Sequence, residues 1–78
     1  MIKVDVQFYG GLEKYTVMKK GQHQTMIRKG ASVLDLLAHL GLPSTLATLV
    51  FTNEEMLPLD AVIPDDASVK IFPPIAGG

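Results

Sequence analysis

A single segment of this chain carries apolar residues at helical spacing, and segments that alternate like strands lie before and after it. The apolar stripe consists of Val33, Leu36, Leu37 and Leu40. Ser32 is a good N-cap because its hydroxyl can accept from the free amides of the first turn, and Asp35 completes a capping box. Gly41 and Pro43 then supply the stop. One short helix with one apolar face needs a sheet to cover that face.

Strand patterns account for much of the remaining sequence. The first segment alternates strictly between apolar and polar side chains, the second does so weakly, and the third is an apolar run of buried-strand length. The fourth is broken by prolines, which is typical of an edge strand and loops because proline cannot donate to a ladder. The predicted strand segments are 2–8, 22–29, 46–52, 57–63 and 68–72. Residues 12–20, which follow Gly10 and Gly11, are compatible with a helical turn or a short strand and stay unassigned.

This order of elements predicts an α+β fold with a mixed sheet and one main helix. We expect the second strand to lie antiparallel to the first. The first and last strands can pair in parallel only across a long connection, and the intervening elements supply one. The simplest arrangement is a β-grasp. A chain of 78 residues has room for one core, so we expect residues 1–72 to form a single domain and residues 73–78 to form a flexible tail.

Composition argues against several functional classes. Seven Lys and Arg against eight Asp and Glu give a net charge of -1, which provides no general attraction for DNA. The chain has no cysteine, so disulfides, thiolate metal sites and a cysteine nucleophile are excluded. His23 and His39 have no neighbours at metal-ligand spacing, and no metal site is predicted. So small a domain leaves little interior for a catalytic pocket, and we expect a carrier or partner subunit rather than an enzyme.

The sequence also predicts where the protein resides. No apolar run approaches the roughly 20 residues of a membrane span. The first residues alternate charged and apolar side chains, unlike a signal peptide. We therefore expect a cytoplasmic protein that makes no use of a membrane.

The end of the sequence, from Pro73 to Gly78, is not explained by the requirements of a sheet. The two prolines stop the last strand and favour an extended path away from it. Gly77 and Gly78 have no Cβ, so a terminal carboxylate can pass through a channel too narrow for side chains. Terminal glycines often have no function, but their position after Phe72 and two prolines at the close of a strand favours one. We predict that the α-carboxylate of Gly78 is the reactive group.

This ending resembles that of the MoaD/ThiS family of ubiquitin-like sulfur carriers. The similarity is strongest over residues 69–78, where an apolar strand, an aromatic residue, two prolines and Gly-Gly follow one another as in MoaD, the small subunit of molybdopterin synthase. The double proline favours the MoaD branch over ThiS. Weaker similarities lie at residues 8–12, 32–37 and 50–53. Two segments depart from the family pattern, namely 66–68 before the last strand and the Gly10-Gly11 pair.

The resemblance implies a sulfur-transfer cycle with catalysis on partner proteins. A ubiquitin-activating-type adenylyltransferase would use ATP and Mg²⁺ to form an acyl-adenylate at Gly78, and a sulfur donor would convert it to a thiocarboxylate. The large subunit of molybdopterin synthase, or an equivalent acceptor enzyme, would then receive the sulfur. The chain itself is expected to bind no cofactor. The residues expected to contact partners are Phe72, Pro73, Pro74, Ile75, Ala76 and Gly77.

Several alternatives stay open at this point. The sulfur acceptor can instead be a thiazole precursor of thiamine, a tRNA base or an amino-acid precursor. A modifier that joins Gly78 to lysines through isopeptide bonds is a second class, and a binding module with an inert tail is a third. Alternation puts Phe72 on the sheet face opposite Val69 and Ile71. There its ring is either covered by the tail or a loop, or free to anchor a partner.

Overall fold

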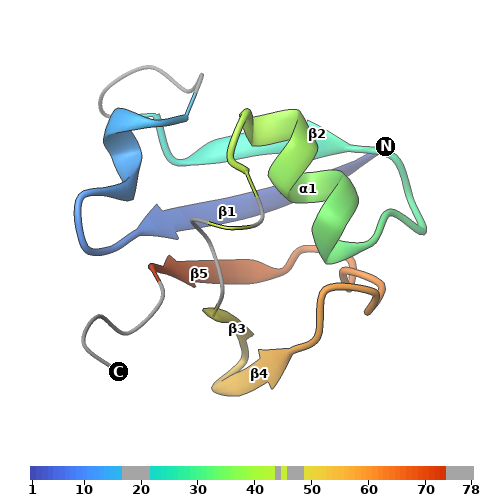
Figure 1. Ribbon diagram of the computed structural model, residues 1–78. Coiled ribbons are helices and arrows are strands. Elements are labelled where there is room, and N and C mark those ends of the chain that lie inside the picture. Colours follow the sequence, from blue (N-terminus) through green and yellow to red (C-terminus); the bar gives the residue numbers. More distant parts are fainter. Residues whose placement is uncertain (17–21, 44, 46–48, 74–78) are drawn as a thin grey trace.

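A five-stranded mixed sheet with one α-helix across one of its faces forms the body of the protein in the computed structural model (Figure 1). The structure describes residues 1–16, 22–43, 45 and 49–73. Along the chain the elements are β1 (Ile2–Phe8), the 3-10 helix η1 (Leu12–Lys14), β2 (Gln24–Ile27), α1 (Val33–Leu40), β3 (Leu49–Thr52), β4 (Glu55–Leu57) and β5 (Ser68–Phe72). The sheet order is β2-β1-β5-β3-β4.

The two central strands of the sheet come from opposite ends of the chain. β1 and β5 pair in parallel, with Val6 opposite Val69 and Phe8 opposite Ile71. The other neighbouring strands pair antiparallel. The parallel pairing and the antiparallel β1–β2 pairing are both as the sequence predicts, and the architecture is the expected α+β β-grasp.

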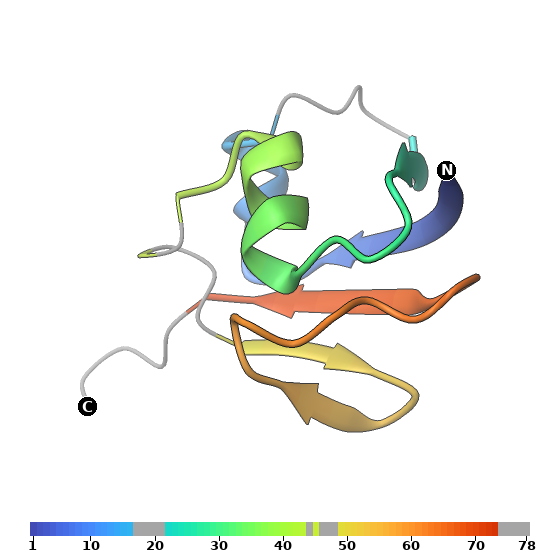
Figure 2. The same cartoon turned by 90° about the vertical axis from the view of Figure 1, so that its right-hand side faces the viewer.

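The core lies between α1 and the sheet face that it covers (Figure 2). All four residues of the predicted helical stripe are buried. They pack with alternate residues of the central strands, because successive strand residues point to opposite faces. The core residues from the strands are Ile2, Val4, Val6, Ile27, Val50, Val69 and Ile71. Among the described residues the opposite face of the sheet carries no helix, so its side chains are left to solvent or to one another.

The predicted capping box at the start of α1 is confirmed. The Ser32 hydroxyl accepts from the Asp35 amide at 3.2 Å, and the Asp35 carboxylate accepts from the Ser32 amide at 2.9 Å. Two further amides of the first turn, those of Val33 and Leu34, donate to the carbonyls of Ala61 and Leu59. The loop after β4 therefore supplies the remaining acceptors of the N-terminal cap. A sequence pattern within the helix does not reveal this contribution.

Replacing Ser32 by Ala is expected to lower the free energy of unfolding by about 1 kcal/mol, because the Asp35 amide loses its acceptor. Hydrogen bonds from the Ser32 amide and the Ser32 hydroxyl lower the pKa of Asp35 from its ordinary value of 3.8. The lowered pKa stabilises the folded state at pH values above 3.8. This stabilisation is lost as the pH falls through the lower pKa of Asp35 in the native state. Urea unfolding and an NMR titration of Asp35 measure both effects.

In the Ser32→Ala variant the native pKa of Asp35 should rise part of the way back, since the backbone amide still donates. Ser68→Ala is the matched control because Ser68 is exposed on β5. Its effect should stay within about 0.5 kcal/mol. Equal destabilisation by the two substitutions would contradict a specific role for the cap.

The predicted start of β3 falls on 46–48, which lie outside the described residues, and is not tested. Elsewhere the strand boundaries differ from the sequence prediction in two places. β2 is limited to Gln24–Ile27, shorter than the predicted 22–29. The edge strand β4 starts at Glu55, before the predicted 57–63, because Asn53 and Glu54 adopt left-handed backbone angles and Thr52 pairs directly with Glu55. A two-residue hairpin turn of this kind lets the strand return at once.

Candidate functional site

The end of β5, where the predicted tail begins, lies beside two other aromatic residues. Phe72 is half-buried and lies on the helix-free face, as the alternation along β5 predicts. Its ring stacks on Tyr9, with centroids 4.4 Å apart and planes 7° apart. Phe51 meets the same ring edge-on, at 5.6 Å and 84°. We call Tyr9, Phe51 and Phe72 the aromatic cluster.

Strand register brings the aromatic cluster together. Phe8 is opposite Ile71, and the Tyr9 amide donates to the Ile71 carbonyl at 2.9 Å, which continues the parallel pairing past the end of β1. On the other side of β5, Leu49 is opposite Phe72 and Phe51 is opposite Lys70. Phe72 therefore lies between the end of β1 and the start of β3.

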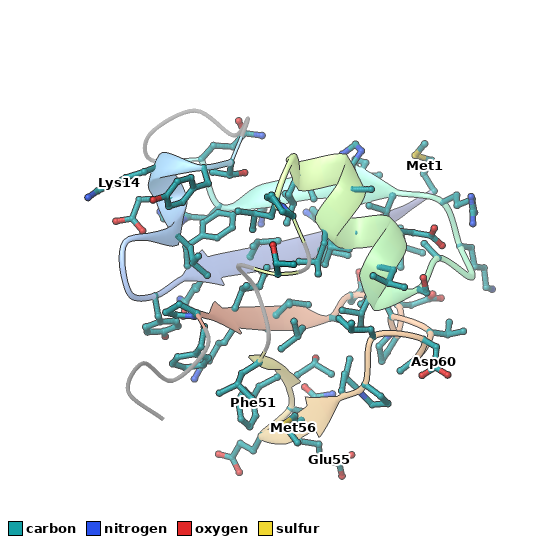
Figure 3. All side chains as sticks on the ribbon, in the orientation of Figure 1. Met1, Lys14, Phe51, Glu55, Met56 and Asp60 are labelled. Carbon is teal, nitrogen blue, oxygen red and sulfur yellow. The ribbon has the colours of Figure 1, made fainter. Side chains whose placement is uncertain are left out.

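The cluster extends toward the sheet edge through Met56. Phe51 and Met56 are cross-strand partners on β3 and β4, and both are labelled at that edge in Figure 3. Met56 is 59% exposed and Tyr9 is 37% exposed. An aromatic and apolar surface thus runs along the helix-free face next to the last described residues, and such surfaces mark interaction sites in soluble proteins.

Pro73 lies directly against Gly10. A Cβ on Gly10 would come within 2.5 Å of the Pro73 Cγ and within 2.7 Å of its Cδ. The φ angle of Gly10 is +65°, a region that residues with a side chain rarely adopt. Backbone conformation and the proximity of Pro73 therefore both require glycine here.

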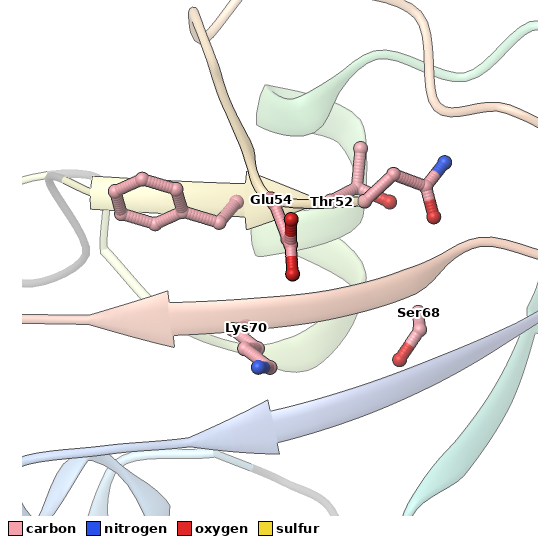
Figure 4. Close-up of a pocket in the computed structure, with 6 residues that line it drawn as sticks. Thr52, Glu54, Ser68 and Lys70 are labelled. Carbon is pink, nitrogen blue, oxygen red and sulfur yellow. The ribbon is translucent and has the colours of Figure 1, made fainter.

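An open hollow lies next to Phe51 of the aromatic cluster, between the β3–β4 turn and β5 (Figure 4). Its volume is 270 Å³. The Thr52 hydroxyl is buried and has no hydrogen-bond partner among the described residues. The residues that line the hollow are Phe51, Thr52, Asn53, Glu54, Ser68 and Lys70. Its polar side chains are mostly exposed, so it supplements the aromatic surface and does not form an enclosed pocket.

Charged side chains form ion pairs in two places away from the aromatic cluster. Arg28 contacts Asp35 at 3.0 Å, and Lys29 contacts Asp65 at 3.9 Å. All four side chains are well exposed, so these pairs contribute little to stability.

The described part of the chain holds no assembled metal site. Within it no three His, Cys, Asp or Glu side chains are grouped as metal ligands. His39 instead shares a hydrogen bond of 2.8 Å with Thr25, which links α1 to β2. No helix in the described ranges has the length and apolar character needed to cross a membrane.

The structure places two of the predicted site residues, Phe72 and Pro73, at the junction of β5 with the segment that follows. The remaining predicted residues, Pro74, Ile75, Ala76, Gly77 and Gly78, lie outside the described residues.

Three residues of this junction, Tyr9, Gly10 and Phe51, are missing from the sequence prediction. In the sequence this region is marked by the weak family similarities at residues 8–12 and 50–53, which contain Tyr9 and Phe51, and by the departure at Gly10-Gly11. None of these signals groups the residues with Phe72, because only the register of β1 and β3 against β5 places Tyr9 and Phe51 beside it.

Both a family model and a solved structure match this chain. The model of the ThiS family matches residues 6–78. The crystal structure of SAMP1 from Haloferax volcanii aligns with a TM-score of 0.62 and 18% sequence identity, covering 97% of this chain and 99% of that one. The curated protein sequences contain no significant match. At this identity the structural similarity establishes the fold, and the family model covers nearly the whole chain.

Proposed function

Because this chain belongs to the ThiS family of ubiquitin-like sulfur carriers, we propose that it carries sulfur as a thiocarboxylate at Gly78 and delivers it during molybdopterin synthesis. The observation that supports this most directly is the junction at Phe72 and Pro73. There the central strand β5 ends against Tyr9 and Gly10, and the sequence continues for five residues to Gly77 and Gly78.

The short distance from this junction to Gly78 ties partner binding to the aromatic cluster. Five residues span at most about 17 Å even when fully extended. Whatever path they take, an enzyme that acts on the Gly78 carboxylate brings its active site within that distance of Pro73. The body of the enzyme therefore meets the end of the sheet, where Tyr9, Phe51 and Phe72 supply exposed or half-buried aromatic surface.

The proposed chemistry places catalysis on the partners. A carboxylate is a poor electrophile, so an oxygen of the Gly78 carboxylate first attacks the α-phosphorus of ATP and releases pyrophosphate. The resulting acyl-adenylate has AMP as a good leaving group. Hydrosulfide from the sulfur donor then attacks the carbonyl carbon, displaces AMP and loses its proton, which leaves the thiocarboxylate. The chain contributes the reacting carbon and its presentation, and the adenylyltransferase contributes ATP, Mg²⁺ and the general acid–base groups.

The double proline is what favours molybdopterin synthesis over the other sulfur acceptors. Pro73 and Pro74 match the MoaD-type ending, and the proposed acceptor enzyme is the large subunit of molybdopterin synthase. Thiazole formation and tRNA thiolation use the same activated carbon and differ only in the acceptor. Transfer of the activated Gly78 to a lysine amine would instead make the chain a protein modifier.

Intact-mass analysis of the chain co-expressed with its adenylyltransferase tests the proposal. We expect one oxygen of the terminal carboxylate to be replaced by sulfur, and the chain expressed alone is the control. A lysine-linked Gly-Gly remnant on other proteins, with no sulfur on the free chain, would point to a modifier. An unchanged mass and no Gly-Gly remnant on other proteins, in the presence of an adenylyltransferase that binds the chain, would contradict both and leave an inert tail.

A further inference from the structure

Gly10, Gly11 and Gly30 have comparable left-handed backbones but different surroundings. Their φ angles are +65° at Gly10, +80° at Gly11 and +88° at Gly30. A Cβ on Gly30 would meet nothing within 4 Å, and one on Gly11 would meet only the end of the Lys14 side chain at 3.9 Å. A Cβ on Gly10 would collide with the ring of Pro73. Gly10 is therefore the glycine of the three whose missing side chain leaves space for another part of the molecule.

The backbone that carries Gly10 is fixed relative to β5. On one side the Tyr9 amide donates to the Ile71 carbonyl at 2.9 Å. On the other side the chain turns into η1, whose Leu12 is 2% exposed within the core. Gly10 thus belongs to a segment whose two ends are held in place, so its backbone cannot easily move away from the Pro73 ring.

Phe72, the residue before Pro73, is held as well. Its ring stacks on Tyr9 and meets the edge of Phe51. The φ angle of Pro73 is restricted by its own ring. Phe72, the last residue of β5, is therefore oriented by Tyr9 and Phe51. Pro73, the first residue of the tail, is oriented by Gly10 in the turn after β1.

We propose that Gly10 is a positioning residue for the C-terminal tail: the Pro73 ring lies on Gly10, and this contact sets the direction in which the chain continues toward Gly78. The functional consequence rests on the proposed function, in which a partner must receive Gly78. Orienting the first residues of the segment in advance reduces the entropy that binding must overcome.

The size of the collision indicates how far a side chain at Gly10 would move Pro73. Carbon atoms pack at about 3.5 to 4.0 Å, so a separation of 2.5 Å falls short by about 1 Å. Gly10 is held between the Tyr9–Ile71 hydrogen bond and the buried Leu12, and Phe72 is held in β5. The displacement therefore falls on the Pro73 ring. A shift of this size changes the direction in which the chain leaves Pro73.

The first test examines the chain alone by NMR. In the wild-type protein we expect a cross-peak between the Gly10 Hα and the ring protons of Pro73. Gly10→Ala should shift the amide resonances of residues 75–78, because the tail leaves in a new direction. Gly30→Ala imposes similar backbone strain without the collision and should leave those resonances in place. Absence of the wild-type cross-peak, or equal effects of the two substitutions on residues 75–78, would overturn the proposal.

The second test measures activation of Gly78 by pyrophosphate exchange with a ubiquitin-activating-type adenylyltransferase. We expect Gly10→Ala to raise the KM for the carrier about tenfold to hundredfold, with a smaller change in kcat, while Gly30→Ala stays within about twofold. A melting curve of each variant checks that both are folded at the assay temperature. Equal KM values for the two variants would count against a positioning role.

A double substitution separates the collision from backbone strain. Replacing Pro73 by Ala removes the Cγ and Cδ atoms that a Cβ on Gly10 would meet. Adding Gly10→Ala to Pro73→Ala should therefore raise KM much less than adding it to the wild type, and a full tenfold effect in both backgrounds would refute the contact. If the wild-type chain supports no exchange, the proposed function fails, and the NMR comparison still decides whether Gly10 directs the tail.

Discussion

Deleting Gly78 is expected to abolish formation of the acyl-adenylate and the thiocarboxylate while leaving the melting temperature unchanged. The proposed reaction needs a carboxylate at the end of the full tail, and the deletion moves that group back by one residue, about 3.5 Å in an extended chain. The core of the described residues ends at Ile71, and Gly78 has no side chain to contribute to it. Pyrophosphate exchange, intact mass and thermal unfolding of the same preparation measure the three quantities.

Gly78→Ala is the informative companion to the deletion. It keeps the length of the chain and the position of the carboxylate but adds a Cβ. If the activating enzyme holds the tail in a channel that excludes side chains, this variant should also lose most of its activation. Full thiocarboxylate formation by the deletion variant would contradict the assignment of Gly78. A marked loss of thermal stability would show that the end of the chain is part of the folded body.

Replacing Phe72 by Ala is expected to weaken binding of the partner enzyme while the domain stays folded. Aromatic residues at interface hot spots contribute about 2 kcal/mol or more, which is roughly 30-fold in Kd. The variant also loses the contacts with Tyr9 and Phe51, each worth about 0.5 to 1.5 kcal/mol. We therefore expect a measurable but modest drop in melting temperature. Titration calorimetry with the adenylyltransferase or the acceptor enzyme measures the affinity.

Ile71→Ala is the matched control because Ile71 is the preceding residue of the same strand and faces the core, where it is 0% exposed. Its substitution should cost about 2 to 5 kcal/mol of stability, a large part of the 5 to 15 kcal/mol typical of domains. The fraction that remains folded should bind the partner nearly as well as wild type. Unchanged affinity in Phe72→Ala would remove Phe72 from the binding surface.

The half-buried state of Phe72 is compatible with both interpretations that the sequence leaves open, and anchoring of a partner stays a prediction. The ring is covered in part, by Tyr9 and Phe51 among the described residues. It also forms part of an apolar face with 37% exposed Tyr9 and 59% exposed Met56. A ring already held by stacking loses less freedom when a partner covers it, so stacking and anchoring support each other.

Local patterns in the sequence were sufficient for most of the fold. The helical stripe and the Ser32 cap predict α1, alternation predicts β1, and the last strand is found at Ser68–Phe72 as predicted. These features depend on burial and on hydrogen bonds within a few residues, so a short stretch of sequence is enough to predict them. The element order then allows β1 and β5 to pair in parallel, because a parallel pair needs a long connection and the intervening elements supply one.

Only the tertiary structure decided which residues surround the start of the tail. Tyr9 and Phe72 come from opposite ends of the chain, and their stacking depends on the register that sets Phe8 opposite Ile71. Gly10 looks like an ordinary turn residue until Pro73 is found against it. The physical reason is that a side chain's own sequence neighbours determine its strand or helix, whereas its contacts across a sheet are determined by strands far away along the chain.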